Sequence, residues 1–206
     1  MTEIIEPHPL LIKYVKKSNA LWTAFDNMTE LNVKMNQLSL NEWHYIMSNL
    51  EQNIFLFKRL KEKNLLKSEV KICDAGIGLG AALFDLYLQS KEIDDVTFKF
   101  YGIEKQTKYI QYLRENLIDF WNEELNIIES DISEENFSEY DIVYSYSPYI
   151  EEEDLFNFYT KLKNEIKPGS IIIENRERGL GLKSVLEKVE GLEKIEIDDI
   201  FIFRKM

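Results

Sequence analysis

The sequence predicts an α/β fold in which helices cover both faces of a mainly parallel β-sheet. From residue 70 onwards, short apolar runs typical of strands alternate with longer runs of helical periodicity, which is the order expected of a three-layer α/β domain. No glycine occurs before Gly76, and the chain up to residue 69 is predicted to be helical. The last two strand-like runs, at 193–197 and 200–204, are too close for a crossover helix, so they must pair antiparallel or not at all.

Residues 1–69 predict an N-terminal helical extension, separate from a domain at 70–206. Its helices are expected over residues 10–17, 20–36 and about 42–63. The third helix is preceded by Ser39 and Glu42, which fit the capping pattern S-x-x-E. Its apolar residues recur at helical spacing. We interpret this stripe as core packing, and a lid over a ligand pocket is the alternative.

The elements after residue 70 each follow from a local pattern. Strands are expected at 70–74, 97–104, 125–130, 141–146 and 170–174, and helices from residue 82 and over 106–124, 152–165 and 182–190. The run 97–104 alternates apolar and polar residues, as a strand does. The helix at 152–165 opens with acidic residues, which complement the helix dipole, and it ends before Pro168 and Gly169.

Composition excludes several classes of function. The chain has 206 residues, a net charge of −12, one cysteine and two histidines. One cysteine rules out an intramolecular disulfide and a multi-thiolate metal site, and two histidines disfavour a histidine-based one, so no metal is expected. Residues 71–206 carry a charge of −13, which disfavours nucleic acid and anionic lipid as partners. The sequence has no basic leader and no apolar run of about 18 residues, which predicts a cytoplasmic protein without a membrane span.

The first chemical signal is a glycine loop between the first strand and the helix that follows it. Gly76, Gly78 and Gly80 allow a tight turn and a close approach to a ligand, and the helix start offers N–H groups to a carboxylate or phosphate. With Ala81 the loop also fits the dinucleotide pattern G-x-G-x-x-A, so a nicotinamide-dependent oxidoreductase is an alternative. Asp74 favours another ligand, because its carboxylate would repel a pyrophosphate and attract an ammonium group.

The run from Asp74 to Gly80 resembles motif I of the class I, Rossmann-like S-adenosylmethionine-dependent methyltransferases. The resemblance covers the chain after the helical extension, and it implies S-adenosylmethionine as cofactor and a Rossmann-like sheet with an antiparallel last strand. It also implies that Glu104 holds the ribose hydroxyls, that Asp131 accepts from the adenine amino group and that Ile132 packs on the adenine ring. The cofactor-binding residues expected on this basis are Asp74, Gly76, Gly78, Gly80, Glu104, Lys105, Asp131, Ile132 and Ser145.

The residues around the methyl acceptor are less specific. Tyr146 at the end of the fourth strand and Tyr149 just after it are the candidate catalytic residues, because their aromatic faces can line the acceptor site and steady a cation. Pro148 and Tyr149 match the Asn/Asp-Pro-Pro-Tyr motif of amino-group methyltransferases. The leading Asn or Asp of that motif is absent here, which disfavours amide and nucleobase acceptors. No general base can be named, because His8 and His44 lie outside the predicted domain.

Several functions stay open at the level of the sequence. The preferred prediction is methyl transfer to an O or N nucleophile of a small molecule. The run from Tyr101 to Lys105 is similar to the non-SET protein-lysine methyltransferases, which implies a protein acceptor as the alternative. A cationic lysine would suit the acidic domain electrostatically. The further alternatives are an NAD-dependent oxidoreductase and a catalytically inactive methyltransferase-fold binding module.

Overall fold

The computed structural model describes residues 56–116, 125–146, 148–149, 151–175, 184–197 and 200–206. The chain divides into two units between Leu40 and Asn41, and every described residue belongs to the second unit. Outside the described residues lie the predicted helices at 10–17 and 20–36, most of the one at 42–63, the end of the one at 106–124, and both histidines. The boundary between residues 69 and 70 and the lid stay predictions. No helix among the described residues is long and apolar enough to cross a membrane.

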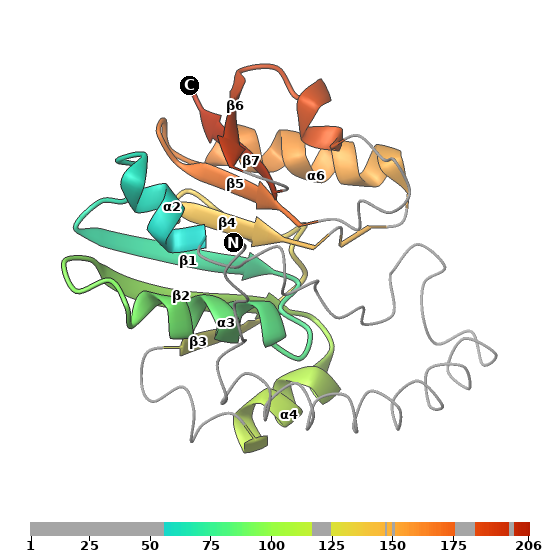
Figure 1. Ribbon diagram of the computed structural model, residues 1–206. Coiled ribbons are helices and arrows are strands. Elements are labelled where there is room, and N and C mark those ends of the chain that lie inside the picture. The colour runs from blue at the N-terminus through green and yellow to red at the C-terminus, as the bar shows by residue number, and fades with distance from the viewer. Residues whose placement is uncertain (1–55, 117–124, 147, 150, 176–183, 198–199) are drawn as a thin grey trace, which may run out of the picture. The chain divides into compact units, whose positions relative to one another are not determined.

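The described part of the chain forms one seven-stranded sheet with the strand order β3-β2-β1-β4-β5-β7-β6 (Figure 1). The strands are β1 (Glu69–Ala75), β2 (Thr97–Glu104), β3 (Leu125–Glu129), β4 (Ile142–Ser145), β5 (Ile171–Glu174), β6 (Leu192–Ile197) and β7 (Ile200–Lys205). Strands β1 to β5 pair in parallel, whereas β7 is antiparallel to both β5 and β6. The predicted α/β sheet with an antiparallel last strand is confirmed.

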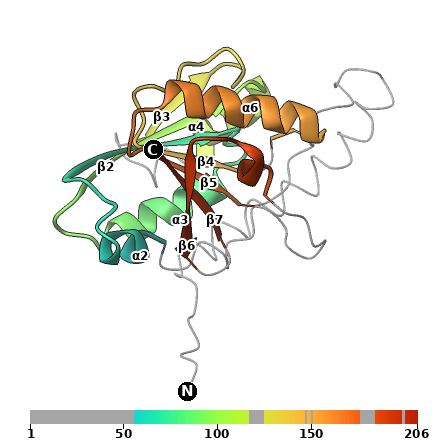
Figure 2. The same cartoon turned by 90° about the horizontal axis from the view of Figure 1, so that it is seen from above.

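Helices cover both faces of this sheet (Figure 2). Those among the described residues are α2 (Leu56–Glu62), α3 (Ala81–Ser90), α4 (Thr107–Asn116), α6 (Glu152–Glu165) and the 3₁₀-helix η4 (Val185–Lys188). On the α3 face, the Tyr87 ring meets Phe100 of β2 edge to face, with the ring centroids 5.7 Å apart. On the α6 face, Phe158 packs in a buried cluster with Val143 and Ile172. The predicted three-layer arrangement is therefore confirmed.

Most predicted element bounds agree with the structure, but one element differs. Strand β2 and helix α6 span the predicted residues. The helix predicted over 182–190 is instead a single 3₁₀ turn, Val185–Lys188, within its described part. Ser184 caps this turn by accepting from the Leu186 N–H group, and the chain reverses at Gly191, which has a φ of 80°. The turn ends at Val189, whose backbone is extended with a φ of −88° and a ψ of 109°, so the helix stops before Gly191 is reached.

The sheet register brings the ends of the parallel strands to one edge. Ile103, Ala75, Ser145 and Glu174 are successive neighbours across β2, β1, β4 and β5. The cofactor residues predicted from the sequence lie at or just after the ends of β1, β2, β3 and β4. In open α/β sheets ligands usually bind outside this carboxyl edge. The fold therefore gathers the predicted site residues from four separate strands.

Candidate functional site

The glycine loop after β1 folds back onto the end of β2. The Gly76 and Ile77 N–H groups both donate to the Ile103 carbonyl oxygen, at N···O distances of 3.0 and 2.9 Å. Gly76, Gly78 and Gly80 have φ angles of 86°, 53° and 74°, which residues with a Cβ rarely adopt. The three glycines are therefore required by the backbone path, and α3 begins directly after them at the carboxyl edge.

Glu104 connects β2 to this loop through its side chain. One carboxylate oxygen accepts from the Gly78 N–H group at 3.0 Å, and the other accepts from the Gln106 N–H group at 2.9 Å. The side chain is only 8% exposed. Burial raises the pKa of Glu104, and the hydrogen bonds from Gln106 and Gly78 partly offset this effect. The residue predicted to hold the ribose thus already contacts the loop predicted to hold the same cofactor.

Asp74 is the second buried carboxyl group at this edge, with 4% of its side chain exposed. Burial, together with the smaller effect of the negative charge of Glu104, raises the pKa of Asp74 to about 8. A nearby cation would favour the ionised form of both groups, whereas an anion would oppose it. The pair therefore fits the ammonium and sulfonium groups of S-adenosylmethionine better than the pyrophosphate of a dinucleotide.

Asp131 follows β3 in a more polar environment. Its Oδ1 accepts from the Ser133 N–H group at 2.9 Å and from the Ser133 hydroxyl at 2.8 Å, and the Lys105 Nζ lies 3.5 Å from its Oδ2. Burial acts to raise the pKa of Asp131, but Ser133 and Lys105 outweigh it and hold this pKa below its usual value. Ile132 is buried with Ile103 in the apolar cluster between the sheet and α6, so its contact with an adenine ring stays a prediction.

The segment after β4 lies beside the glycine loop. A Cβ added to Gly76 would lie 3.8 Å from the Pro148 Cβ. The ring of Tyr149 packs edge to face on Phe158 of α6, with the centroids 5.8 Å apart. Both Tyr146 and Tyr149 are half-buried. This geometry places the predicted acceptor segment next to the predicted cofactor loop, and the catalytic role of the two tyrosines stays a prediction.

Ser145 lies close to Tyr144 and Asn175, two buried residues that the sequence did not mark as part of the site. Ser145 is fully buried, and the Tyr159 hydroxyl donates to its Oγ at 3.4 Å. Asn175 donates its backbone N–H to the Ser145 carbonyl oxygen at 2.9 Å and its side-chain amide to the Tyr144 hydroxyl at 2.7 Å. A tyrosine inside an apolar strand gives no functional signal by itself. The one sequence signal was the polar pair Glu174-Asn175 directly after an isoleucine run.

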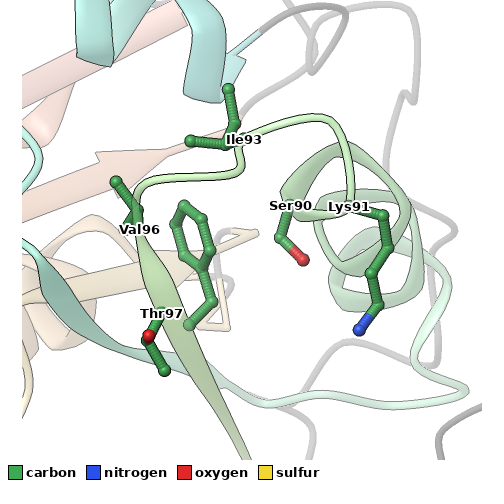
Figure 3. Close-up of a pocket in the computed structure, with 6 residues that line it drawn as sticks. Ser90, Lys91, Ile93, Val96 and Thr97 are labelled. Carbon is green, nitrogen blue, oxygen red and sulfur yellow. The ribbon is translucent and has the colours of Figure 1, made fainter.

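A cavity of about 260 Å³ lies at the opposite edge of the sheet (Figure 3). It is lined by Ser90, Lys91, Ile93, Val96, Thr97 and Phe98. These residues belong to the end of α3, the start of β2 and the turn between them, so the cavity lies at the amino ends of the strands. No predicted site residue lines it. The described residues also contain no group of three or more His, Cys, Asp or Glu side chains that could hold a metal ion.

Several solved structures with a similar fold are described as methyltransferases. A protein from Listeria monocytogenes, provisionally described as a class I S-adenosylmethionine-dependent methyltransferase, matches with a TM-score of 0.57 and 18% identity over 79% of this chain and 63% of its own. TrmN from Thermus thermophilus matches with a TM-score of 0.52 and 14% identity, over 74% of this chain and 48% of its own. A protein from Methanococcus maripaludis, provisionally described as an S-adenosylmethionine-dependent methyltransferase, matches with a TM-score of 0.55 and 16% identity, over 76% of this chain and 84% of its own. The chain thus spans less than two thirds of the first two proteins.

These similarities establish the class I methyltransferase fold. No curated protein matches the chain. A family model described as PRMT5 arginine-N-methyltransferase matches residues 17–147, which is more than half of the sequence. The matched segment contains the glycine loop, Glu104 and Asp131, and it favours a methyltransferase over a nicotinamide-dependent oxidoreductase. The chain therefore belongs to the PRMT5 arginine-N-methyltransferase family, whose methyl donor is S-adenosylmethionine.

Proposed function

We propose that this chain transfers a methyl group from S-adenosylmethionine to a nitrogen atom of a guanidinium group. The observation that carries the proposal is the glycine loop bonded to buried Glu104, with buried Asp74 beside it, in a segment that matches an arginine-N-methyltransferase family. The loop and the two acids supply what a cationic, ribose-containing donor needs. The family match supports a guanidinium nitrogen as the acceptor.

S-adenosylmethionine, when bound, would supply an electrophilic methyl group on a sulfonium sulfur. Transfer would break the sulfur–methyl bond, leave S-adenosylhomocysteine and release one proton of the guanidinium group to solvent. In the proposed site Glu104 accepts hydrogen bonds from the ribose hydroxyls, and Asp131 accepts one from the adenine amino group. Ionised Asp74 attracts the ammonium group at the other end of the donor. Tyr146 and Tyr149 line the acceptor side and orient the acceptor nitrogen toward the methyl group. Holding two reactants in line can supply several kcal/mol of the barrier, so positioning alone accounts for much of the catalysis.

The charge distribution supports a cationic acceptor. The chain carries a net charge of −12. Glu151, Glu152 and Glu153 are exposed at the start of α6, just after Tyr149. Acids near an acceptor site raise the local concentration of cations and lower that of anions. A guanidinium group is therefore favoured over a nucleic acid. It can belong to a small molecule, which is the acceptor that the sequence favours, or to a protein side chain.

Methylation assays with matched acceptors test this proposal. The full chain is incubated with methyl-labelled S-adenosylmethionine and, separately, with a glycine-rich arginine peptide, the same peptide with lysine in place of arginine, and free arginine. We expect label on a guanidinium nitrogen, with the peptide and free arginine distinguishing the two sources. The Glu104→Gln variant is the control for background transfer.

Two results would contradict the proposal. Label on the lysine peptide alone would favour the protein-lysine alternative. Donor binding without label on any acceptor would favour the inactive binding module.

A further inference from the structure

Four buried polar side chains form an arc at the carboxyl edge of the sheet, on its α3 face. The members of this polar arc are Glu104 of β2, Asp74 of β1, Tyr144 of β4 and Asn175 after β5. Each is at most 8% exposed. Asp74 and Tyr144 are direct neighbours in the register, while Glu104 and Asn175 lie two residues beyond the neighbours Gly102 and Ile173. Because side chains two residues apart in a strand share a face, all four lie on the same side.

The Tyr144 hydroxyl is held at the carboxyl edge rather than within the sheet. The register partner of Tyr144 on β5 is Ile173, yet its hydroxyl accepts from the Asn175 side-chain amide at 2.7 Å, two residues further along. Asn175 is itself anchored, because its backbone N–H donates to the Ser145 carbonyl oxygen at 2.9 Å. The tyrosine side chain therefore leans toward the same edge as the glycine loop.

We propose that Tyr144, held by Asn175, forms the wall of the methyl-transfer site and contacts the group at the methyl position of the donor. This inference rests on the proposed function, in which Glu104 and Asp74 form the donor half of the polar arc. Adjacent strands lie about 4.8 Å apart, so the next position beyond Asp74 is that of Tyr144. The predicted acceptor segment continues from Tyr144 along the same strand end.

The chemistry of a sulfonium suits a hydroxyl at this place. The positive sulfur makes the C–H groups of its methyl electron-poor, and such groups favour contact with an oxygen atom. A phenylalanine would fit the apolar surroundings of this strand without the cost of burying a hydroxyl. Asn175 acts through Tyr144 and is a positioning residue, whereas the Tyr144 oxygen is the contacting atom.

Two donor analogues test the contact without any acceptor. Sinefungin carries an amine at the methyl position, with CH in place of the sulfonium, whereas S-adenosylhomocysteine has no group there. Calorimetry gives the Kd of both ligands for the natural chain and for Tyr144→Phe. We expect Tyr144→Phe to weaken sinefungin about tenfold and S-adenosylhomocysteine less than about twofold, because only the former reaches the hydroxyl.

Tyr140→Phe is the matched control. Tyr140 is also buried, at 7% exposure, and it belongs with Cys73 to the cluster on the α6 face. Its removal should leave both Kd values unchanged. Asn175→Leu removes the donor that holds the hydroxyl, and it should show the same selective loss as Tyr144→Phe at a smaller size. If circular dichroism shows that Tyr144→Phe does not fold, Asn175→Leu serves as the test in its place.

The outcomes separate this inference from the proposed function. Equal changes for both ligands, or no change, in a chain that binds them would overturn the role of Tyr144 alone. A natural chain that binds neither ligand would overturn the proposed function, and this inference with it.

Discussion

Two aspartates at the same edge of the sheet respond to the fold in opposite ways. Burial raises the pKa of Asp74 to about 8, whereas hydrogen bonds from Ser133 and the charge of Lys105 hold the pKa of Asp131 below its usual value against a smaller burial. The residue type is the same, and only the surroundings differ. Asp131 is therefore ionised at neutral pH, while Asp74 exchanges a proton near it.

Donor binding should consequently depend on pH through Asp74. A cationic donor favours ionised Asp74, so binding below about pH 8 requires the loss of a proton. We expect the Kd for S-adenosylmethionine to rise by up to about tenfold per pH unit as the pH falls from about 8 to about 6. Calorimetry across this range measures it. Asp74→Asn cannot ionise and should bind S-adenosylmethionine weakly at every pH. Any pH dependence of its Kd therefore comes from titration of the donor itself. An unchanged Kd in the natural chain would contradict this assignment.

The stability of the folded chain should also depend on pH through Asp74. The folded pKa of Asp74, about 8, exceeds its ordinary value of 3.8. Its contribution to stability is therefore full below about pH 4 and is lost as the pH rises toward 8. Asp74→Asn cannot ionise, so its free energy of unfolding, and with it its Tm, should gain on that of the natural chain as the pH rises. The gain in free energy should be up to about 1.4 kcal/mol per pH unit and should level off above about pH 8. A Tm difference independent of pH would contradict this.

The two acids at the glycine loop should matter more for the donor than another buried acid does. Asp74→Ala and Glu104→Ala each remove a charged partner, and we expect either to weaken S-adenosylmethionine binding by about 1 kcal/mol or more. Asp85→Ala is the matched control, because Asp85 on α3 is also buried, its pKa is raised to about 7, and it lies outside the predicted site. Equal losses in all three variants would point to a general effect of destabilisation.

Among the elements, the packing of the glycine loop on β2 depends on one residue without a side chain. A Cβ on Gly102 would lie 2.3 Å from the Ile77 Cδ1 and 3.0 Å from its Cβ. Gly102 thus lets Ile77 of the loop sit directly on β2, where the loop also bonds to Ile103. The glycine pattern of the loop itself was evident in the sequence, but this second requirement was not.

Gly102→Ala should therefore disturb the loop through packing alone. We expect a loss of about 1–3 kcal/mol in the free energy of unfolding, the usual cost of overpacking a core, together with weaker donor binding. Denaturant unfolding and calorimetry measure the two effects. Adding Ile77→Val removes the closest atom, Cδ1, and should restore part of both losses. A double variant no better than the single one would show that the clash is not the cause.

At the scale of the whole molecule, charge is the property that bears most on function. The net charge of −12 is the sum of −13 on residues 71–206 and +1 on the first 70 residues. Many surface charges of the described domain are paired, for example Lys67 with Asp141 at 2.6 Å and Lys99 with Glu69 at 2.9 Å, at the amino ends of the strands. The acids at the start of α6 lie near the predicted acceptor segment, and one of them, Glu152, pairs with Lys188.

Salt should accordingly weaken recognition of a cationic acceptor. Raising the salt concentration from about 0.1 M to about 1 M shortens the screening length from about 10 Å to about 3 Å. We expect the KM for an arginine peptide of net positive charge to rise severalfold, with kcat nearly constant. A peptide with the same arginine and flanking aspartates, of zero net charge, should respond less. Initial rates measure both, and a KM insensitive to salt would contradict an electrostatic role for the acidic domain.

The sequence by itself determined the elements and the donor loop. The strand at 97–104 and the helix at 152–165 were predicted with their observed bounds. The loop glycines Gly76, Gly78 and Gly80 all have the positive φ angles that a tight turn of glycines predicts. These features depend on neighbours within a few residues, so a local pattern is enough to specify them. The helix predicted at 182–190 was wrong because the backbone becomes extended at Val189, and in the described part only one 3₁₀ turn forms before it.

Only the tertiary structure decided the chemistry of the site. The raised pKa of Asp74 results from burial and from Glu104, which is 30 positions away in the chain. Tyr144 and Asn175 are 31 positions apart and meet because β4 and β5 pair in parallel. Burial, charge coupling and hydrogen bonds between strands arise from contacts that no local pattern records. For that reason the sequence identified the donor loop, while the wall of the proposed methyl-transfer site became visible only in the folded sheet.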